Sequence, residues 1–206
     1  AYHLTASGTP TYSGNGPTTD VGSYLFSGSA QYLYSASTPT TNWPVSISAW
    51  FNSDSATLSQ TIAAFADSGQ ADNYAVLEAA GSVASDPIRW RSYGDGGSER
   101  IATTGAVGYS ADTWTFASGD YDGGAGHARI SGANTGTQNS DPISADFNYI
   151  SIAVARRSSL TNYFDGEISQ VQFNNVGHTA NYDLTMFNMM SPTITFYSVG
   201  TYVPIG

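Results

Sequence analysis

The sequence predicts an all-β domain, because it combines alternating strands, frequent turn residues and a uniform composition. Val45-Ser46-Ile47-Ser48-Ala49-Trp50-Phe51 places apolar residues on one face and mainly serine on the other, as a half-buried strand does. Trp50 breaks the polar face, so a second layer is expected to cover part of it. Similar short runs recur between clusters of glycine, aspartate and serine, and no linker interrupts them. One β-sandwich or barrel is therefore expected.

Several strands are expected on either side of this central one, and turn residues join most of them in pairs. The expected pairs are Gly22–Phe26 with Ala30–Tyr34, Gln60–Ala66 with Asn73–Ala79, Ile88–Tyr93 with Ser98–Thr103, and Thr113–Tyr121 with His127–Ser131. Further strands are expected at Ile150–Val154, which with Val45–Phe51 is predicted to be an inner strand, at Tyr163–Phe173 and at Thr193–Val203. The alternation within Tyr163–Phe173 slips by one residue, which predicts a bulge between Ile168 and Val171.

One segment shows a helical spacing instead. Leu184, Phe187 and Met190 recur at every third residue within Ala180–Met190, and Pro192 follows. At most one or two short helices are therefore expected. Residues 1–20 are rich in Ser, Thr, Gly and Pro and predict an N-terminal arm or irregular lead-in, whereas residues 21–206 predict a single domain.

The charge and the composition exclude several functional classes. The net charge is −10, which disfavours nucleic acid and anionic membranes as partners. All 6 basic residues are arginine, so lysine-based Schiff-base chemistry is excluded, and the absence of cysteine excludes disulfides and thiolate metal sites. No apolar run could span a bilayer, and no signal-peptide core lies near Ala1. We expect Ala1 to follow either a removed signal or a removed initiator methionine.

Three stretches resemble the LamG-type branch of the concanavalin A-like lectin/glucanase superfamily. They are Tyr24–Leu33 with its Phe-Ser-Gly turn, interpreted as an early hairpin, Val45–Phe51, and Tyr163–Phe173. Thr113–Phe116 and Tyr121–Gly123 fit the strand and the turn that lie between the second and third stretches. The resemblance implies an antiparallel jelly-roll β-sandwich of two sheets. Proteins with such folds include lectins, hydrolases, adhesion modules and virion proteins, so the fold alone does not select a function.

A catalytic site is not expected. A glycosidase needs two carboxylates about 5–9 Å apart. Glu167 has an acidic residue at strand spacing, Asp165, but the intervening Gly166 indicates a turn or the start of a strand. His127 lies beside a predicted turn, where a solvated or capping role is the ordinary one. We therefore predict a protein without enzymatic activity and assign no catalytic residue.

Calcium is the one cofactor that the sequence leaves open. Calcium takes oxygen ligands from carboxylates and backbone carbonyls in loops. Asp67 and Asp72 could supply them in one loop, and Asp120 and Asp122 in another. The resemblance also implies a calcium site, because LamG-type domains often hold calcium at one rim. The alternative is that these aspartates bond to the backbone of their own turns.

Aromatic side chains are the candidates for stacking on a sugar ring. Trp43, Trp90, Tyr93 and Tyr109 lie near predicted strand ends or turns, and Trp43, directly before Pro44, is expected to be the most exposed ring. The alternative is that most of these rings fill the core of the sandwich or its rim.

Together these expectations indicate a non-enzymatic, surface-displayed structural or adhesion protein. A phage virion decoration or fibre protein is the preferred setting, held at the virion surface in many copies by protein partners of a capsid or fibre. Glycans are a further possible ligand class. The Thr5–Thr19 segment and the apolar tail Tyr197–Ile205 are the candidates for attachment. The alternatives are a secreted, lectin-like carbohydrate-binding module and a polysaccharide-active enzyme.

Overall fold

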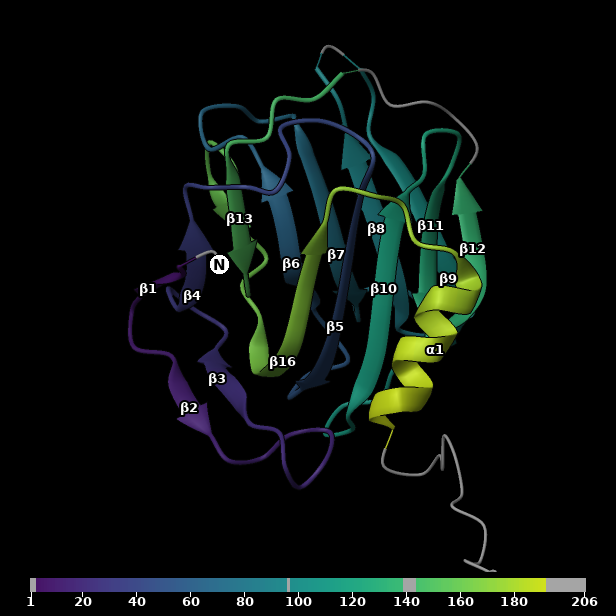
Figure 1. The fold of residues 1–206 in the computed structure, drawn as a ribbon. Coiled ribbons are helices and arrows are strands. Elements are labelled where there is room, and N and C mark those ends of the chain that lie inside the picture. Colours follow the sequence, from purple (N-terminus) through teal and green to yellow (C-terminus); the bar gives the residue numbers. More distant parts are fainter. Residues whose placement is uncertain (1–2, 96, 139–143, 192–206) are drawn as a thin grey trace, which may run out of the picture.

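The computed structural model describes residues 3–95, 97–138 and 144–191. These residues form two antiparallel seven-stranded sheets that stack face to face, together with a two-stranded hairpin and one helix (Figure 1). In order across the first sheet, the strands are β1 (Thr5–Ser7), β4 (Tyr32–Ser35), β13 (Tyr149–Ile152), β6 (Ser59–Ala66), β7 (Tyr74–Ala80), β8 (Pro87–Tyr93) and β9 (Arg100–Gly108). In the second sheet they are β12 (Ala133–Gln138), β11 (Gly126–Ile130), β10 (Thr115–Tyr121), β5 (Val45–Ser53), β16 (Asp165–Asn174), β3 (Ser23–Ser27) and β2 (Thr11–Ser13). The predicted jelly-roll sandwich is confirmed.

The Val45 strand is the middle strand of the second sheet. β5 lies between β10 and β16, and the side chains of Val45, Ile47 and Phe51 are fully buried against the first sheet. The opposite face carries Ser46, Ser48 and Trp50, and these side chains are buried as well. The helix α1 (Ala180–Met190) supplies the expected second layer, because the Phe187 ring stacks on Trp50 at a centroid distance of 5.7 Å.

Most of the predicted strand pairs are confirmed. β6 pairs with β7, β8 with β9, and β10 with β11, each joined by the turn that the sequence indicates. β13, which covers most of the predicted strand Ile150–Val154, is an inner strand of the first sheet. The predicted bulge lies in β16, where the register with β5 shifts between Ser169 and Gln172 and Gln170 adopts a φ of 52°.

The expected hairpin over Gly22–Tyr34 is wrong. β3 pairs with β2 and β16 in the second sheet, whereas β4 pairs with β1 and β13 in the first, so the turn carries the chain from one sheet to the other. Gly28 enables this crossing with a φ of 72°, and its N–H donates to the Phe164 carbonyl at 3.0 Å. Turn residues predict that the chain changes direction, but distant strands decide which sheet each arm joins.

The described part of the expected N-terminal arm is folded onto the domain. β1 pairs with β4 at the edge of the first sheet, and β2 pairs with β3 at the edge of the second. Backbone hydrogen bonds to an existing sheet edge order a segment that is too polar to form a core of its own. The predicted strand Thr193–Val203 and the tail Tyr197–Ile205 lie outside the described residues.

The helix matches its predicted bounds, Ala180–Met190. The Thr179 side chain caps it by accepting from the Tyr182 N–H at 3.2 Å. Its single fully buried residue is a charged one, Asp183, which faces the second sheet. Within the described chain, no helix is long and apolar enough to cross a membrane.

A buried network of charges fastens this helix to the sheet. The Arg129 guanidinium on β11 donates to the carboxylates of Asp120 on β10 and Asp183 on α1, the second at 2.9 Å. Its other terminal nitrogen donates to the His178 carbonyl at 3.2 Å. The His178 ring pairs with the second oxygen of Asp183 at 3.1 Å. All four side chains are buried, so each charge depends on its partners rather than on water.

Replacing Arg129 should therefore destabilise the fold strongly. Arg129→Met leaves two buried carboxylates without their shared cation, and we expect a loss of about 3–5 kcal/mol in the free energy of unfolding. Urea denaturation monitored by circular dichroism measures this loss. Arg157→Met, which removes a half-buried arginine that forms no salt bridge within the described chain, is the control and should cost clearly less stability. Equal losses in the two variants would contradict the role assigned to the network.

Candidate functional site

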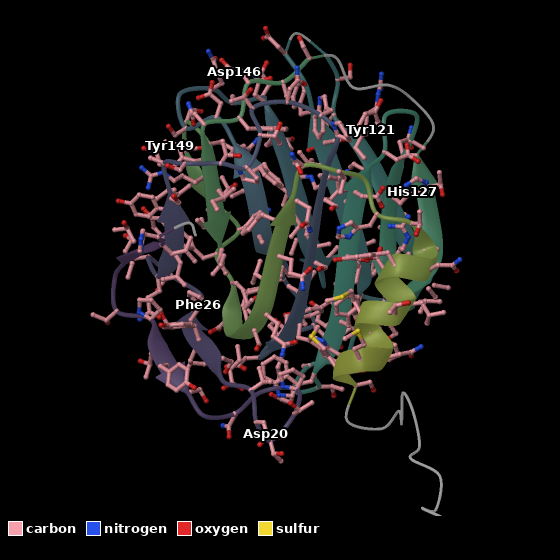
Figure 2. All side chains as sticks on the ribbon, viewed as in Figure 1. Asp20, Phe26, Tyr121, His127, Asp146 and Tyr149 are labelled. Atoms are coloured by element: carbon pink, nitrogen blue, oxygen red, sulfur yellow. The ribbon has the colours of Figure 1, made fainter. Side chains whose placement is uncertain are left out.

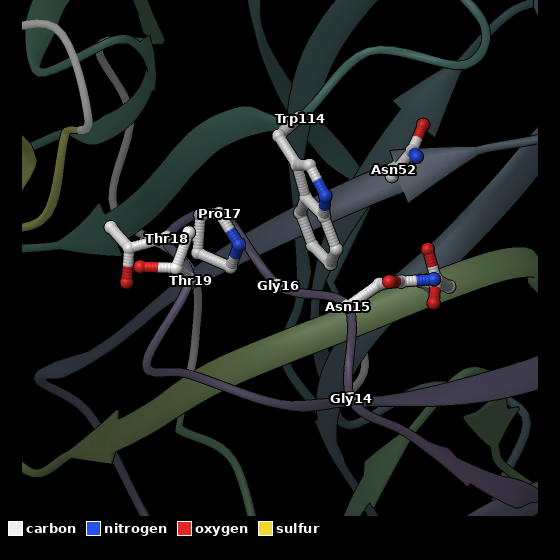
Figure 3. Close-up of a pocket in the computed structure, with 9 residues that line it drawn as sticks. Gly14, Asn15, Gly16, Pro17, Thr18, Thr19, Asn52 and Trp114 are labelled. Atoms are coloured by element: carbon white, nitrogen blue, oxygen red, sulfur yellow. The ribbon is translucent and has the colours of Figure 1, made fainter.

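An open pocket of about 610 Å³ lies on the outer face of the second sheet, toward the end of the sandwich at which β5 finishes (Figure 3). The loop of residues 14–19 forms its wall, and Asn52, Trp114 and Glu167 supply the remaining side chains. The volume lies within the usual range of small-ligand sites, about 300–1,000 Å³.

Strand register brings these three side chains together. Asn52 on β5 is directly opposite Glu167 on β16. Trp114 immediately precedes β10, whose first residue, Thr115, is opposite Phe51. The antiparallel register therefore places Trp114 next to Asn52. Because Phe51 points into the core, its neighbour Asn52 points outward. The result is an outward-facing row of an indole ring, an amide and a carboxylate across three neighbouring strands.

The wall of the pocket follows β2, within the segment expected to be an arm. The loop is folded tightly back on itself, with Pro17 buried and the Val21 N–H donating to the Thr18 carbonyl at 3.3 Å. Gly16 permits this turn, since a Cβ there would lie 1.8 Å from the Val21 carbonyl oxygen. The N-terminal segment therefore completes the pocket.

The lining offers the contacts that a saccharide uses. Trp114 is half-buried, and Figure 3 shows its ring reaching into the space that Asn15 and Asn52 border. The Asn52 Oδ1 is buried and has no hydrogen-bond partner among the described residues. Glu167 accepts a hydrogen bond from the Ser23 hydroxyl at 3.1 Å through one oxygen. A flat ring can stack on the C–H face of a sugar, while the amide and carboxylate bind its hydroxyls.

The surroundings of the pocket are acidic. Burial raises the pKa of the Asp54 carboxyl, just past the end of β5, and neighbouring carboxylates, first those of Asp165 and Asp112, raise it further. Glu167 contributes to the same effect. No arginine lines the pocket among the described residues. A neutral ligand is therefore favoured over an anionic one.

The two acidic residues considered for catalysis do not share this pocket. Asp165 lines a separate hollow of about 300 Å³ together with Asp54, whereas Glu167 lines the Trp114 pocket. Gly166 lies between them with a φ of 125°, a conformation that interrupts the regular strand geometry. One carboxylate in the pocket suits hydrogen bonding to a ligand better than two-carboxylate hydrolysis.

The aromatic residues selected from the sequence lie elsewhere. Trp90 has no exposed surface and packs in the core against Gly119 and Gly126, so its assignment as a ligand-stacking ring is corrected. Tyr109 is also buried, and its hydroxyl donates to the Ser55 carbonyl at 3.0 Å, so the same correction applies. Both rings fill space between the sheets.

Trp43 and Tyr93 keep some exposed surface but lie outside the pocket. Trp43 is half-buried and meets the rings of Tyr121 and Phe147 edge-on, at 5.3 and 4.9 Å. Tyr93 packs on Tyr74 on the outer face of the first sheet. Trp114, Asn52 and Glu167 were missed because their proximity depends on register between distant strands. The available signal was Asn52, the one amide side chain of the strand, which lies on the same face as Ser46 and Ser48.

The structure brings two of the predicted calcium ligands together. Oxygen atoms of Asp120 and Asp122 and a nitrogen of His127 lie within 4.8 Å of one another, the one such group among the described residues (Figure 2 shows His127 beside the helix). Their atoms are already engaged, because Asp120 binds Arg129 and His127, and Asp122 accepts from the N–H groups of its own turn. Calcium at this group stays a prediction.

The other predicted calcium loop is held by backbone and amide contacts. Asp67 accepts from the Gly69 N–H at 2.8 Å and from the Asn148 amide at 2.7 Å, as a turn-forming aspartate does. Asp72 is half-buried in the same loop. No described group of three metal-ligating side chains includes either residue.

Comparison with known proteins gives one family and many similar structures. The model of a family described as the concanavalin A-like lectin/glucanases superfamily, Laminin_G_3, matches residues 27–181. A comparison with curated proteins gives no match. Among solved structures, the binding domain of botulinum neurotoxin serotype G has a TM-score of 0.68 at 12% identity, and the match covers 93% of this chain and 47% of that one. This chain thus spans about half the length of the toxin domain.

Two further structures match more of their own length. Domain 4 of an extracellular arabinanase from Geobacillus stearothermophilus, solved with arabinotriose, has a TM-score of 0.59 at 15% identity, covering 89% of this chain and 86% of that one. A heptameric pentraxin from Limulus polyphemus has a TM-score of 0.64 at 12% identity, covering 79% and 80%. At these identities the similarity establishes the fold alone.

The acidic surroundings of the pocket predict a pH-dependent stability. Because the pKa of Asp54 is raised in the folded state, the fold loses stability as pH rises from below the unfolded-state value of 3.8 through the folded-state value. Asp54→Asn should therefore raise the melting temperature at about pH 7, and the gain should vanish near pH 3, where the wild-type carboxyl is protonated in both states. Asp95→Asn, in an exposed turn, is the control. A gain that persists unchanged at the lower pH would contradict the assignment.

Proposed function

The chain belongs to the concanavalin A-like lectin/glucanase superfamily, and we propose that it is a non-catalytic carbohydrate-binding module whose ligand binds in the Trp114 pocket. The observation that supports this most directly is the Trp114 ring beside the Asn52 amide and the Glu167 carboxylate. These groups combine an apolar stacking surface with polar groups that can bind hydroxyls in one open site.

The side chains that line the pocket favour binding over hydrolysis. Its described lining contains one carboxylate, Glu167, whereas glycoside hydrolysis ordinarily uses two. The similar structures support the same reading, because they include an arabinanase domain solved with a trisaccharide and toxin domains described as binding domains. We infer a neutral saccharide, because acidic side chains surround the site and none of its described lining residues is basic.

We further propose that the protein is displayed in many copies on a phage virion, as a decoration or fibre protein. Its net charge of −10 supports this setting, because repulsion keeps densely displayed domains from associating. A secreted module is the alternative. Immunogold labelling of intact particles from an infected culture should show the protein on the virion surface. Recovery in the particle-free supernatant alone would instead favour the secreted module.

The binding function is tested by removing the ring. We expect the wild-type protein to bind neutral glycans on an array, and Trp114→Ala to weaken that binding about tenfold, which corresponds to the loss of a contact worth about 1.4 kcal/mol. Glu167→Gln should weaken it as well, because a charged acceptor becomes a neutral one. Melting temperatures verify that both variants are folded.

Tyr93→Ala, which removes a ring from the other sheet, is the matched control and should bind as the wild type does. Equal binding by the wild type and Trp114→Ala would contradict the assignment of the pocket. The same samples are assayed for new reducing ends with each bound polysaccharide. Sustained release that Glu167→Gln abolishes would show that the protein is an enzyme.

A further inference from the structure

Most arginines of this acidic protein gather on the outer face of the first sheet. Arg89 and Arg91 alternate along β8, and Arg156 belongs to the small hairpin of β14 (Ala155–Arg156) and β15 (Leu160–Thr161), which packs against β6. Arg157 follows directly, and its guanidinium lies 4.7 Å from the centre of the Tyr74 ring on the same face. One face thus collects four of the chain's 6 basic residues.

Neighbouring carboxylates on the same face neutralise two of these arginines. The Arg89 and Arg91 guanidinium groups lie 3.9 and 3.3 Å from the carboxylate of Glu78, and Arg91 also binds Glu99. No salt bridge within the described chain reaches Arg156 or Arg157. The uncompensated positive charge of this face therefore lies at the hairpin.

Arg156 is held by rings rather than by carboxylates. Its guanidinium carbon lies 4.2 Å from the centre of the Tyr34 ring and 4.4 Å from that of Tyr149. Its one hydrogen bond within the described residues goes to the Tyr32 hydroxyl at 3.5 Å, and its Nε has no partner. Figure 2 shows Tyr149 on the side of the molecule away from the helix. We call these four residues, Tyr32, Tyr34, Tyr149 and Arg156, the arginine cradle.

The arginine cradle presents an ordered but unsatisfied cation. The guanidinium is a planar group with several N–H donors, and its position over two tyrosine rings restricts its motion before any ligand arrives. Arg156, Tyr34 and Tyr149 are all half-buried, so part of each remains open to solvent. A fixed planar fork of donors matches the paired oxygens of a carboxylate or a sulfate.

We propose that the arginine cradle is a second binding site, which binds the anionic group of an acidic saccharide. It lies on the outer face of the first sheet, whereas the Trp114 pocket lies on the outer face of the second, so the two sites are separate. The tyrosine hydroxyls around Arg156 can bind the sugar hydroxyls next to the anionic group. The anion site rests on the geometry of Arg156, while the choice of a saccharide as the carrier of the anion rests on the proposed function.

The test measures binding of the full chain to three immobilised polymers by biolayer interferometry. Polygalacturonate carries carboxylates, dextran sulfate carries sulfates, and dextran is the neutral reference. We expect the wild type to bind at least one anionic polymer more tightly than dextran, and Arg156→Gln to weaken that binding about tenfold. Tighter binding to polygalacturonate would indicate recognition of a carboxylate, and tighter binding to dextran sulfate would indicate recognition of a sulfate.

Three further variants separate a formed site from general attraction of charge. Arg89→Gln removes the same charge from the same face and should change affinity by less than about twofold. Tyr149→Ala should weaken binding without any change in charge, and Tyr149→Phe, which keeps the ring over Arg156 but not the hydroxyl, should restore most of it. Trp114→Ala should bind the anionic polymers as the wild type does, so a failure of the neutral-glycan pocket would not affect this result.

The proposal is overturned if the folded wild type binds neither anionic polymer more tightly than dextran. It is also overturned if Arg89→Gln and Arg156→Gln weaken binding equally, because the attraction would then be a property of the whole face. Equal binding by Tyr149→Ala and the wild type would show that ring stacking does not form the site.

Discussion

The placement of the helix depends on one buried guanidinium, that of Arg129. It lies between the carboxylates of Asp120 and Asp183, which come from the sheet and from the helix. The other oxygen of each carboxylate contacts a histidine ring: Asp120 contacts His127, and Asp183 contacts His178. A buried charge is tolerated only when its partners are in place. A shift of the helix would leave a buried carboxylate without its cation and would therefore destabilise the fold. The helix in turn covers Trp50, and the Trp114 pocket lies next to it on the same face, where β5 ends.

The parts of the fold that local periodicity encodes were predictable. The alternation in β5, the extra residue in β16 and the three-residue spacing in α1 each follow from side chains near one another in sequence. The crossing between β3 and β4 was not predictable in this way, since Gly28 specifies a turn but not the sheet that follows it. Trp90 was misplaced for a related reason, because only the packing of two sheets shows that its ring meets Gly119.

The candidate site illustrates the same limit more sharply. Trp114 and Asn52 are far apart in sequence, and they become neighbours through the pairing of β10 with β5. The wall comes from a Ser-, Thr- and Gly-rich stretch whose composition indicates an arm. That stretch is ordered by edge pairing, a long-range interaction that composition does not encode. The sequence therefore identifies the elements, while their register forms the site.

The edge strand β2 has a consequence for ligand affinity. Its three residues, Thr11–Ser13, connect the wall of the pocket to the sheet, and β3 is its neighbour in that sheet. Short edge strands separate from their sheet more readily than central ones. The wall of the pocket, which follows β2, therefore has a lower local stability than Asn52 and Glu167, which lie on the inner strands β5 and β16. A ligand that contacts both parts binds only the closed form, and its measured affinity is reduced by the fraction of time that the edge is open. Mutations in β2, distant from any sugar, would then act as affinity mutations by changing that fraction.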